Sequence, residues 1–273
     1  MERVKSTEEF SMLKKNSLSG HNPQMINSEI FFEGNGNILH CQKDVSLKNV
    51  TLRFLGSNSL IFLSSSKHQY GLTVNIFNNS TLYFGENNYF NPHGQNMNLI
   101  LSEGKNILFG KNCLFSFGVS IRLADPHLIY NIDTKKRINP SKSVFIGDHV
   151  WIGQDALILK GTQIGSGSII GANSVIANKR VVSNSSWAGN PAKLIRKRVF
   201  YTEDCVHSWS ETDTIQFEYK HSEAFVYNNT PGETLTFDDI DKEINSFLTA
   251  KEKLAYLLSH ISSNTNKNRF SLE

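Results

Sequence analysis

Between Ile146 and Lys193 an aliphatic residue or alanine recurs at every sixth position, with polar residues and glycine filling most of the positions between. Six is not a multiple of the helical 3.6, so these positions drift around a helix and form no single apolar stripe. One short strand plus one turn per repeat satisfies the pattern, because three repeats close a triangular coil of about 18 residues. The residues expected inside are Ile146, Ile152, Ile158, Ile164, Ile170, Ile176, Val182 and Ala188.

The pattern predicts a β-solenoid in which each coil is stabilised by its neighbours. Glycine follows five of the inward positions directly and suits corners where φ is positive or the backbone approaches closely. By strand alternation, a second series one place earlier is expected to face outward, toward solvent or another subunit. Its members are Trp151, Leu157, Ile169, Val175 and Val181.

Residues 30–121 are rich in asparagine and hold short apolar bursts without a fixed period, which predicts strands separated by turns. A Gly-x-Asn corner begins at four glycines here and again at Gly171, so the same corner chemistry continues into the regular half. We therefore interpret residues 30–198 as one solenoid. A separate small β domain is the alternative for the N-terminal half. The four glycines are Gly56, Gly85, Gly104 and Gly110.

The six-residue spacing first appears at Phe109, Phe115 and Ile121, then stops and resumes at Ile146. The residues between, 122–145, are polar and without a repeat. A solenoid accommodates such an insertion as an excursion from a corner, where binding faces commonly form. His127 is the main candidate for chemistry in this loop, because a neutral imidazole accepts a proton near neutral pH. A surface histidine without function is the alternative, and His149, in a corner of the repeat, is interpreted as a solvated turn residue.

After residue 198 the composition changes to aromatic and acidic residues without a clear period. From about 237 to 261, apolar residues at helical spacing predict an amphipathic helix packed on the solenoid or on a neighbouring subunit. A partner-binding or membrane-facing helix is the alternative. The last residues, 262–273, are predicted to be disordered. The domain plan is an N-terminal segment 1–29, a β-helix 30–198 with the inserted loop 122–145, and a C-terminal extension 199–273.

Composition then narrows the functional class. The 273 residues carry a net charge of +3 and are 39% hydrophobic, which fits a soluble protein and is too weakly basic to indicate nucleic-acid binding. Three scattered cysteines indicate neither a disulfide framework nor a zinc motif, so we expect a cytoplasmic protein without a metal. We expect no signal peptide and no transmembrane segment; association with a membrane surface stays open.

No motif for a covalent nucleophile is present. The sequence lacks a G-x-S-x-G elbow, a P-loop and an H-E-x-x-H motif. Cys113 lies two places before the in-phase Phe115 and is interpreted as a small apolar filler. Direct transfer without a covalent intermediate is therefore the simpler chemistry.

Residues 96–198 resemble the left-handed β-helix, hexapeptide-repeat acetyltransferases, in particular the branch of galactoside and maltose acetyltransferases. The segment DPHLIYNIDTKKRIN is most similar to bacterial capsule polysaccharide O-acetyltransferases, such as those that act on polysialic acid. The remaining markers are I-G-D-H-V-W-I-G at 146–153, I-G-A-N-S-V-I at 170–176 and A-G-N-P-A-K at 188–193.

The resemblance implies an all-β, left-handed parallel β-helix that assembles as a homotrimer, with acetyl-CoA in the groove between neighbours. It implies an O-acetyltransferase that acts on a sugar hydroxyl in a capsule or lipopolysaccharide glycan. An N-acetyltransferase of an amino-sugar nucleotide and a non-catalytic solenoid scaffold are the two alternatives.

The resemblance also assigns roles to individual residues. His127 matches the family's general base, and Asn96 matches an asparagine that contacts the acceptor. Asp125 is assigned to the acceptor side, where it orients His127 or forms the turn before Pro126.

Coenzyme contacts are implied along the regular coils. Gln154 stands where the family often has a small residue, and the stretch from Ile176 to Ala188 holds one residue more than in the galactoside branch. The residues assigned to the coenzyme are Trp151, Gln154, Ala172 and Ala177 along the pantetheine arm, and Lys193 and Arg196 near the nucleotide phosphates.

Overall fold

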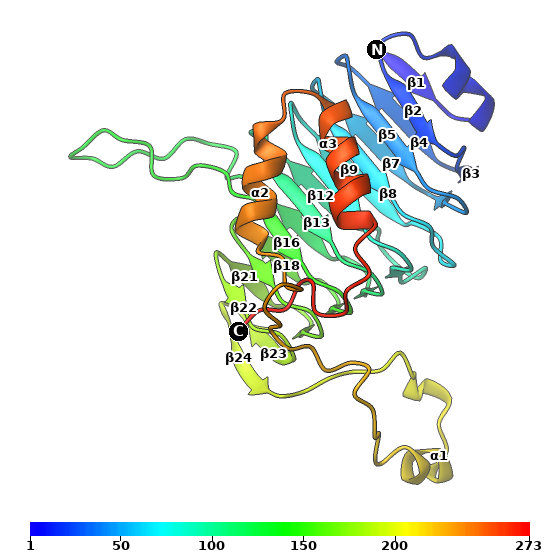
Figure 1. Ribbon diagram of the computed structural model, residues 1–273, viewed down its shortest axis with the longest axis vertical. Coiled ribbons are helices and arrows are strands. Elements are labelled where there is room, and N and C mark those ends of the chain that lie inside the picture. Colours follow the sequence, from blue (N-terminus) through cyan, green and yellow to red (C-terminus); the bar gives the residue numbers. More distant parts are fainter.

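A computed structural model of residues 1–273 shows a triangular prism of about seven coils, stacked in chain order from the N-terminal end to the C-terminal end (Figure 1). The fold is a left-handed parallel β-helix with a projecting loop and a small helical part near the C-terminus, as predicted. Three sheets run along the prism and form its faces.

We call the faces sheets I, II and III. Sheet I contains β1 (Glu2–Val4), β4 (Glu29–Phe32), β7 (Thr51–Phe54), β9 (Leu72–Ile76), β12 (Met97–Leu101), β15 (Ser120–Arg122), β18 (Leu157–Leu159) and β21 (Val175–Ala177). Sheet II contains β2 (Ser17–Gly20), β5 (Ile38–Cys41), β8 (Leu60–Leu63), β10 (Thr81–Phe84), β13 (Asn106–Phe109), β16 (Val144–Ile146), β19 (Gln163–Ile164) and β22 (Arg180–Val181). Sheet III contains β11 (Tyr89–Phe90), β14 (Leu114–Phe115), β17 (Trp151–Ile152), β20 (Ile169–Ile170), β23 (Ser185–Gly189) and β24 (Ala192–Lys197). A fourth, two-stranded sheet pairs β3 (Gln24–Ile26) with β6 (Ser46–Lys48).

The predicted inward series is correct through Ile176 and then slips by one residue. Ile158 pairs with Ile176 as expected, but Ile164 pairs with Val181 and Ile170 pairs with Trp187. Val181 is fully buried, and Trp187 packs against the core. The prediction that Val182 and Ala188 point inward, and Val181 outward, is therefore wrong, because the last coil is one residue shorter than the coils before it.

The N-terminal half continues the same stack with wider coils. Register partners on sheet II lie 22 residues apart at Ile38 and Leu60, and 18 apart at Ile146 and Ile164. The larger triangle is filled by aromatic rings, such as the stacked Phe84 and Phe109, whose centroids are 4.3 Å apart. Wider coils explain why this half shows no six-residue period. Its Gly-x-Asn corners place Asn58, Asn87 and Asn112 at φ between 55° and 57°.

Both ends of the prism are closed by antiparallel strands. β1 pairs antiparallel with β4 at one end, and β24 pairs antiparallel with β23 at the other. An uncapped parallel sheet would expose unpaired backbone groups to other chains. The two end strands therefore each cover the edge of one sheet, β1 that of sheet I and β24 that of sheet III.

The outer face of sheet II is covered by the C-terminal extension (Figure 1). Helices α2 (Phe237–Ser246) and α3 (Ala250–Tyr256), followed by the π-helical turn η3 (Leu257–Ser262), pack on it in a second apolar cluster of 15 buried residues. The single helix predicted over 237–261 is interrupted because Phe247 is extended and Thr249 opens a new helix with Glu252 in a capping box. Shorter elements are η1 (Thr7–Met12), η2 (Val206–Ser208) and α1 (Glu211–Gln216).

The C-terminal tail is held to the solenoid, so the prediction of a disordered tail is wrong. The guanidinium of Arg269 donates two hydrogen bonds of 2.9 Å to the carboxylate of Asp148, and both side chains are almost fully buried. Phe270 and Leu272 accept backbone hydrogen bonds from Ser166 and Ser183. The tail thus closes the helical layer onto the last coils.

Breaking the Asp148–Arg269 pair should destabilise the protein strongly. In Arg269→Met the carboxylate of Asp148 stays buried without its partner, which lowers the free energy of unfolding by about 3–5 kcal/mol. Urea titration followed by circular dichroism measures the loss. The exposed Arg3–Glu29 pair supplies the control, because Arg3→Met should cost about 1 kcal/mol or less. Equal losses in the two variants would contradict the assignment.

The buried Lys253 should make stability depend on pH. Its Nζ donates to the Asn79 carbonyl oxygen, and burial lowers the pKa of Lys253 to about 8. The folded state then favours the neutral amine, so the contribution of Lys253 to stability should rise by a few kcal/mol between pH 8 and 10.5 and be constant below pH 8. Lys253→Met should abolish this rise, as measured by urea titrations at pH 7, 8, 9 and 10. An equal rise in stability with pH in Lys253→Met would show that Lys253 is not its cause.

Candidate functional site

The inserted loop is an arm that leaves the prism at the corner between sheets I and II and projects from the body (Figure 1). Its two sides pair through a hydrogen bond from the Ile138 amide to the Ile129 carbonyl at 2.9 Å, and a turn at Asn131 closes the tip. Apolar side chains are bare along it, with exposed fractions of 82% for Ile132 and 54% for Tyr130. A projecting arm with an apolar surface lacks a packing partner within its own chain.

Asn139 fixes the base of the arm. Its buried side-chain amide donates to the His127 carbonyl oxygen at 2.8 Å and accepts from the Ile129 amide at 2.9 Å. Both contacts hold the backbone on either side of Leu128, so the start of the arm has a defined path. Asn139 is the last residue of the marker DPHLIYNIDTKKRIN, and the sequence alone predicts no role for it.

Two ion pairs anchor the same region to neighbouring coils. Arg137 donates to both carboxylate oxygens of Glu103, at 2.6 and 3.0 Å, and these bonds, together with Ser141, lower the pKa of Glu103 to about 2. Lys160 lies 2.6 Å from the Asp125 carboxylate, and its hydrogen bond lowers the pKa of Asp125. The carboxylates at the arm base therefore stay charged at neutral pH.

His127 itself is exposed, and its ring makes no hydrogen bond within the chain. The Asp125 carboxylate is bound by Lys160 and by Asn139 at 3.2 Å, and has no hydrogen bond to His127. Asn96 is half-buried on the coil before the arm, where its side-chain nitrogen donates to the Asn49 carbonyl at 2.7 Å. The imidazole is thus free to meet a molecule from solvent.

Trp151 lies on the outer face of sheet III, beside an aromatic stack that the sequence did not reveal. His149 is 2% exposed, and its ring lies parallel to that of Tyr201 with the ring centroids 4.1 Å apart. The ring centroids of Tyr201 and Trp151 are 5.8 Å apart. Burial lowers the pKa of His149, so the interpretation of His149 as a solvated turn residue is wrong. The Tyr201 hydroxyl is buried without a hydrogen-bond partner.

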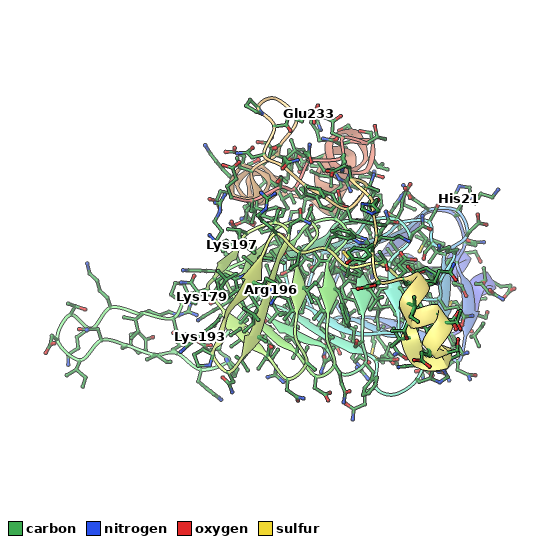
Figure 2. The ribbon with its side chains drawn as sticks, turned by 90° about the horizontal axis from the view of Figure 1, so that it is seen from below. His21, Lys179, Lys193, Arg196, Lys197 and Glu233 are labelled. Carbon is green, nitrogen blue, oxygen red and sulfur yellow. The ribbon has the colours of Figure 1, made fainter.

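The remaining predicted coenzyme residues occupy several parts of the regular coils. Gln154 and Ala172 lie at the same corner in successive coils, joined by a hydrogen bond from the Asn173 amide to the Gln154 carbonyl. Ala177 ends β21, on the sheet I ladder that also contains Arg122 and Leu159. Lys193 and Arg196 are exposed on the end strand β24 (Figure 2).

One chain does not bring these groups together. The arm with His127 leaves the corner between sheets I and II, whereas Trp151 lies on sheet III. In a triangular prism a corner lies opposite the third face, so the base of the arm and Trp151 lie on opposite sides of the prism. A single site that contains both requires two copies of the chain.

No group of three or more His, Cys, Asp or Glu side chains is arranged to hold a metal ion. None of the helices has the length and apolar character that crossing a bilayer requires.

Comparison with known proteins agrees with this fold. Residues 143–178 match the bacterial transferase hexapeptide (six repeats) family. A polysialic acid O-acetyltransferase of Neisseria meningitidis is 27% identical over 117 residues, which are 43% of this chain; the chain spans 53%, about half, of that relative's length.

Two solved structures extend the similarity along the chain. The polySia-specific acetyltransferase NeuO matches 75% of this chain and 94% of its own, with 27% identity and a TM-score of 0.64. The polysialic acid O-acetyltransferase OatWY matches 76% of this chain and 100% of its own, with 25% identity and a TM-score of 0.54. The resemblance found in the motifs is confirmed.

Replacing Asn139 by alanine should loosen the arm at its base. The amides of residues 127–130 should exchange with deuterium at least about tenfold faster, because two hydrogen bonds that hold this backbone are lost. Hydrogen exchange with mass spectrometry measures the effect. Asn131→Ala is the matched control, since it removes an asparagine from the tip and should affect the tip alone. Unchanged exchange at 127–130 in Asn139→Ala would contradict the role.

Proposed function

We propose, from the similarity of this hexapeptide-repeat β-helix to polysialic acid O-acetyltransferases, that the chain transfers an acetyl group from acetyl-CoA to a sugar hydroxyl. The acceptor belongs to a bacterial capsule or lipopolysaccharide glycan. The observation that carries the proposal is His127, a free imidazole at the fixed base of a projecting arm, within the motif that resembles the family's general base.

The working unit is a homotrimer. The arm and Trp151 lie on opposite sides of one prism, so a closed ring of three prisms lets the arm of one subunit reach sheet III of the next. The bare apolar side chains of the arm, Leu128, Ile129, Tyr130, Ile132 and Ile138, then gain a surface to pack against. Burial of this apolar surface favours the assembly.

The chemistry is direct acyl transfer. His127 removes the proton from the acceptor hydroxyl while the oxygen attacks the thioester carbonyl carbon. A backbone N–H group of the neighbouring coil donates to the oxyanion. The carbon–sulfur bond then breaks, the thiolate of coenzyme A leaves, and the imidazolium returns its proton to the sulfur. No residue is acylated, and the products are the acetyl ester and the free thiol.

The regular coils suit an extended coenzyme. Ala172 and Ala177 are exposed and small, so the pantetheine arm can approach the backbone groups beside them. Trp151 and Gln154, on and beside sheet III, line one groove with Ala177 of sheet I only where two prisms meet. Lys193 and Arg196 have no acidic partner within the chain and are available to nucleotide phosphates. Acetyl-CoA enters as a co-substrate, and no metal takes part in the steps we propose.

The acceptor meets the coenzyme at the arm base. Asn96 retains a free side-chain oxygen for an acceptor hydroxyl, because only its nitrogen is hydrogen-bonded within the chain. Asp125, with its carboxylate held by Lys160, lies at the other end of sheet I from Asn96, so both can border one acceptor only where two subunits meet. We place the reaction in the cytoplasm, in keeping with three cysteines that form no disulfide.

His127→Ala should lower the turnover of acetyl-CoA with a glycan acceptor by about 10²–10⁴-fold, the usual loss for a general base. Release of the coenzyme thiol, followed with a thiol reagent, measures it. His93→Ala removes another exposed histidine and should keep wild-type turnover. A purified His127→Ala protein with near-normal turnover would sink the assignment.

The acceptor class needs a separate measurement. Mass spectrometry of surface glycans from a strain that lacks this protein should show the loss of an ester-linked acetyl group from one polymer. Loss of an amide-linked acetyl group would instead support an N-acetyltransferase. Absence of any change, with no acetyl-CoA consumed by glycans or amino-sugar nucleotides, would favour a scaffold.

A further inference from the structure

Residues 202–223 form an excursion from the body of the protein. They leave after Tyr201, carry η2 and α1, and return at Ala224; α1 lies well away from the prism (Figure 1). Helix α1 has six residues, none of them buried, although a capping box at Ser210 defines its start. So short a helix is marginal in water without tertiary packing. The excursion therefore lacks its packing partner in the isolated chain.

The surface of the excursion is both acidic and apolar. Residues 202–223 contain six acidic side chains and one lysine. The only ion pair within the excursion joins Lys220 to Asp204 at 3.5 Å. Ile215 is 67% exposed and Tyr219 is 73% exposed. A partner for this surface must present positive charge together with apolar area.

The same chain presents such a surface at the C-terminal end of the prism. No acidic residue occurs between Asp155 and Glu203. On the end strand, Leu194 and Ile195 are exposed among the charges. We call this the basic end surface; its cations are Lys179, Arg180, Lys193, Arg196, Lys197 and Arg198, all exposed and none in an ion pair within the chain (Figure 2).

The excursion leaves the prism near its C-terminal end (Figure 1), and α1 and the labelled cations of the basic end surface lie on opposite sides of the molecule in Figure 2. No ion pair joins them within one chain. Two complementary patches on opposite sides of a molecule are what a heterologous contact in a closed ring requires.

We propose that residues 202–223 of one subunit dock on the basic end surface of a neighbouring copy of this chain. The acidic side chains pair with Lys179, Arg180, Lys197 and Arg198, which leaves Lys193 and Arg196 to the coenzyme. Ile215 and Tyr219 cover Leu194 and Ile195. This contact goes beyond acetyl transfer and does not depend on it; only the number of subunits rests on the trimer proposed above. It also agrees with that ring, because the excursion begins beside Trp151 and the basic end surface adjoins the corner that carries the arm.

Carbodiimide coupling of carboxylates to lysines tests the contact in the full-length protein. One copy carries Glu211→Gln and Glu218→Gln and keeps its lysines; the other carries Lys179→Arg and Lys197→Arg and keeps its carboxylates. Neither copy alone can form an amide bond between Glu211 or Glu218 and Lys179 or Lys197. Arginine preserves the charge of the basic end surface. After co-expression, mass spectrometry should find Glu211 or Glu218 coupled to Lys179 or Lys197 between chains. Assemblies without such links would overturn the proposal.

A spin label on Cys205 gives a second readout, because Cys41 and Cys113 are buried and only Cys205 is exposed. The label should be immobile in the assembled protein and mobile in Arg180→Glu/Lys197→Glu. Adding Glu211→Lys/Glu218→Lys to that variant should restore immobility through reversed pairs. A label that is mobile in every form, or one immobilised only by vesicles of anionic phospholipid, would refute docking between copies.

Neither readout needs an acetyl donor or acceptor. Loss of the cross-link with thiol release intact would reject the contact alone. The cross-link without thiol release would leave the contact standing and reject the proposed enzyme.

Discussion

The structure depends on one constraint: every coil must place its inward side chains directly on those of the coil before it. Parallel backbone pairing enforces this, since a shift of one residue turns each side chain to the other face. Asparagine corners with positive φ, such as Asn87 and Asn173, let the chain turn sharply enough to keep the register. Extra residues can therefore enter only at corners, where the arm between β15 and β16 leaves the stack.

The same constraint explains how much of the fold can be predicted from the sequence. Where a coil has 18 residues the period is visible, and Ile146 to Ile176 are placed correctly. In the wider N-terminal coils the period disappears, although the corner asparagines still mark the turns. A one-residue deletion before Val181 is invisible to a fixed period. The tail was missed because Arg269 is ordered by Asp148, which lies 121 residues away.

The residues of the candidate site also form two groups: those that lie in short sequence motifs and those that act through contacts formed only on folding. His127 and Trp151 are proposed from motifs, which are short local patterns of the sequence. Asn139 and Tyr201 are not found, since each acts through a contact that only folding creates: Asn139 with the His127 backbone, Tyr201 with the His149 ring. Helices α2 and α3 cover sheet II, which leaves sheets I and III as the bare long faces. Because sheet II is covered, a neighbouring copy can pack directly against sheets I and III but not against sheet II.

The antiparallel strands β1 and β24 have a further consequence for how such a protein can change its length. Each cap is specific to the coil it covers, so a new coil cannot be appended at either end without first removing a cap. Duplication of an internal coil meets no such obstacle and would lengthen the prism by about 4.8 Å, the spacing between paired strands. The prism can therefore be lengthened by inserting coils in its middle. The length of the prism can change in this way while both ends stay the same.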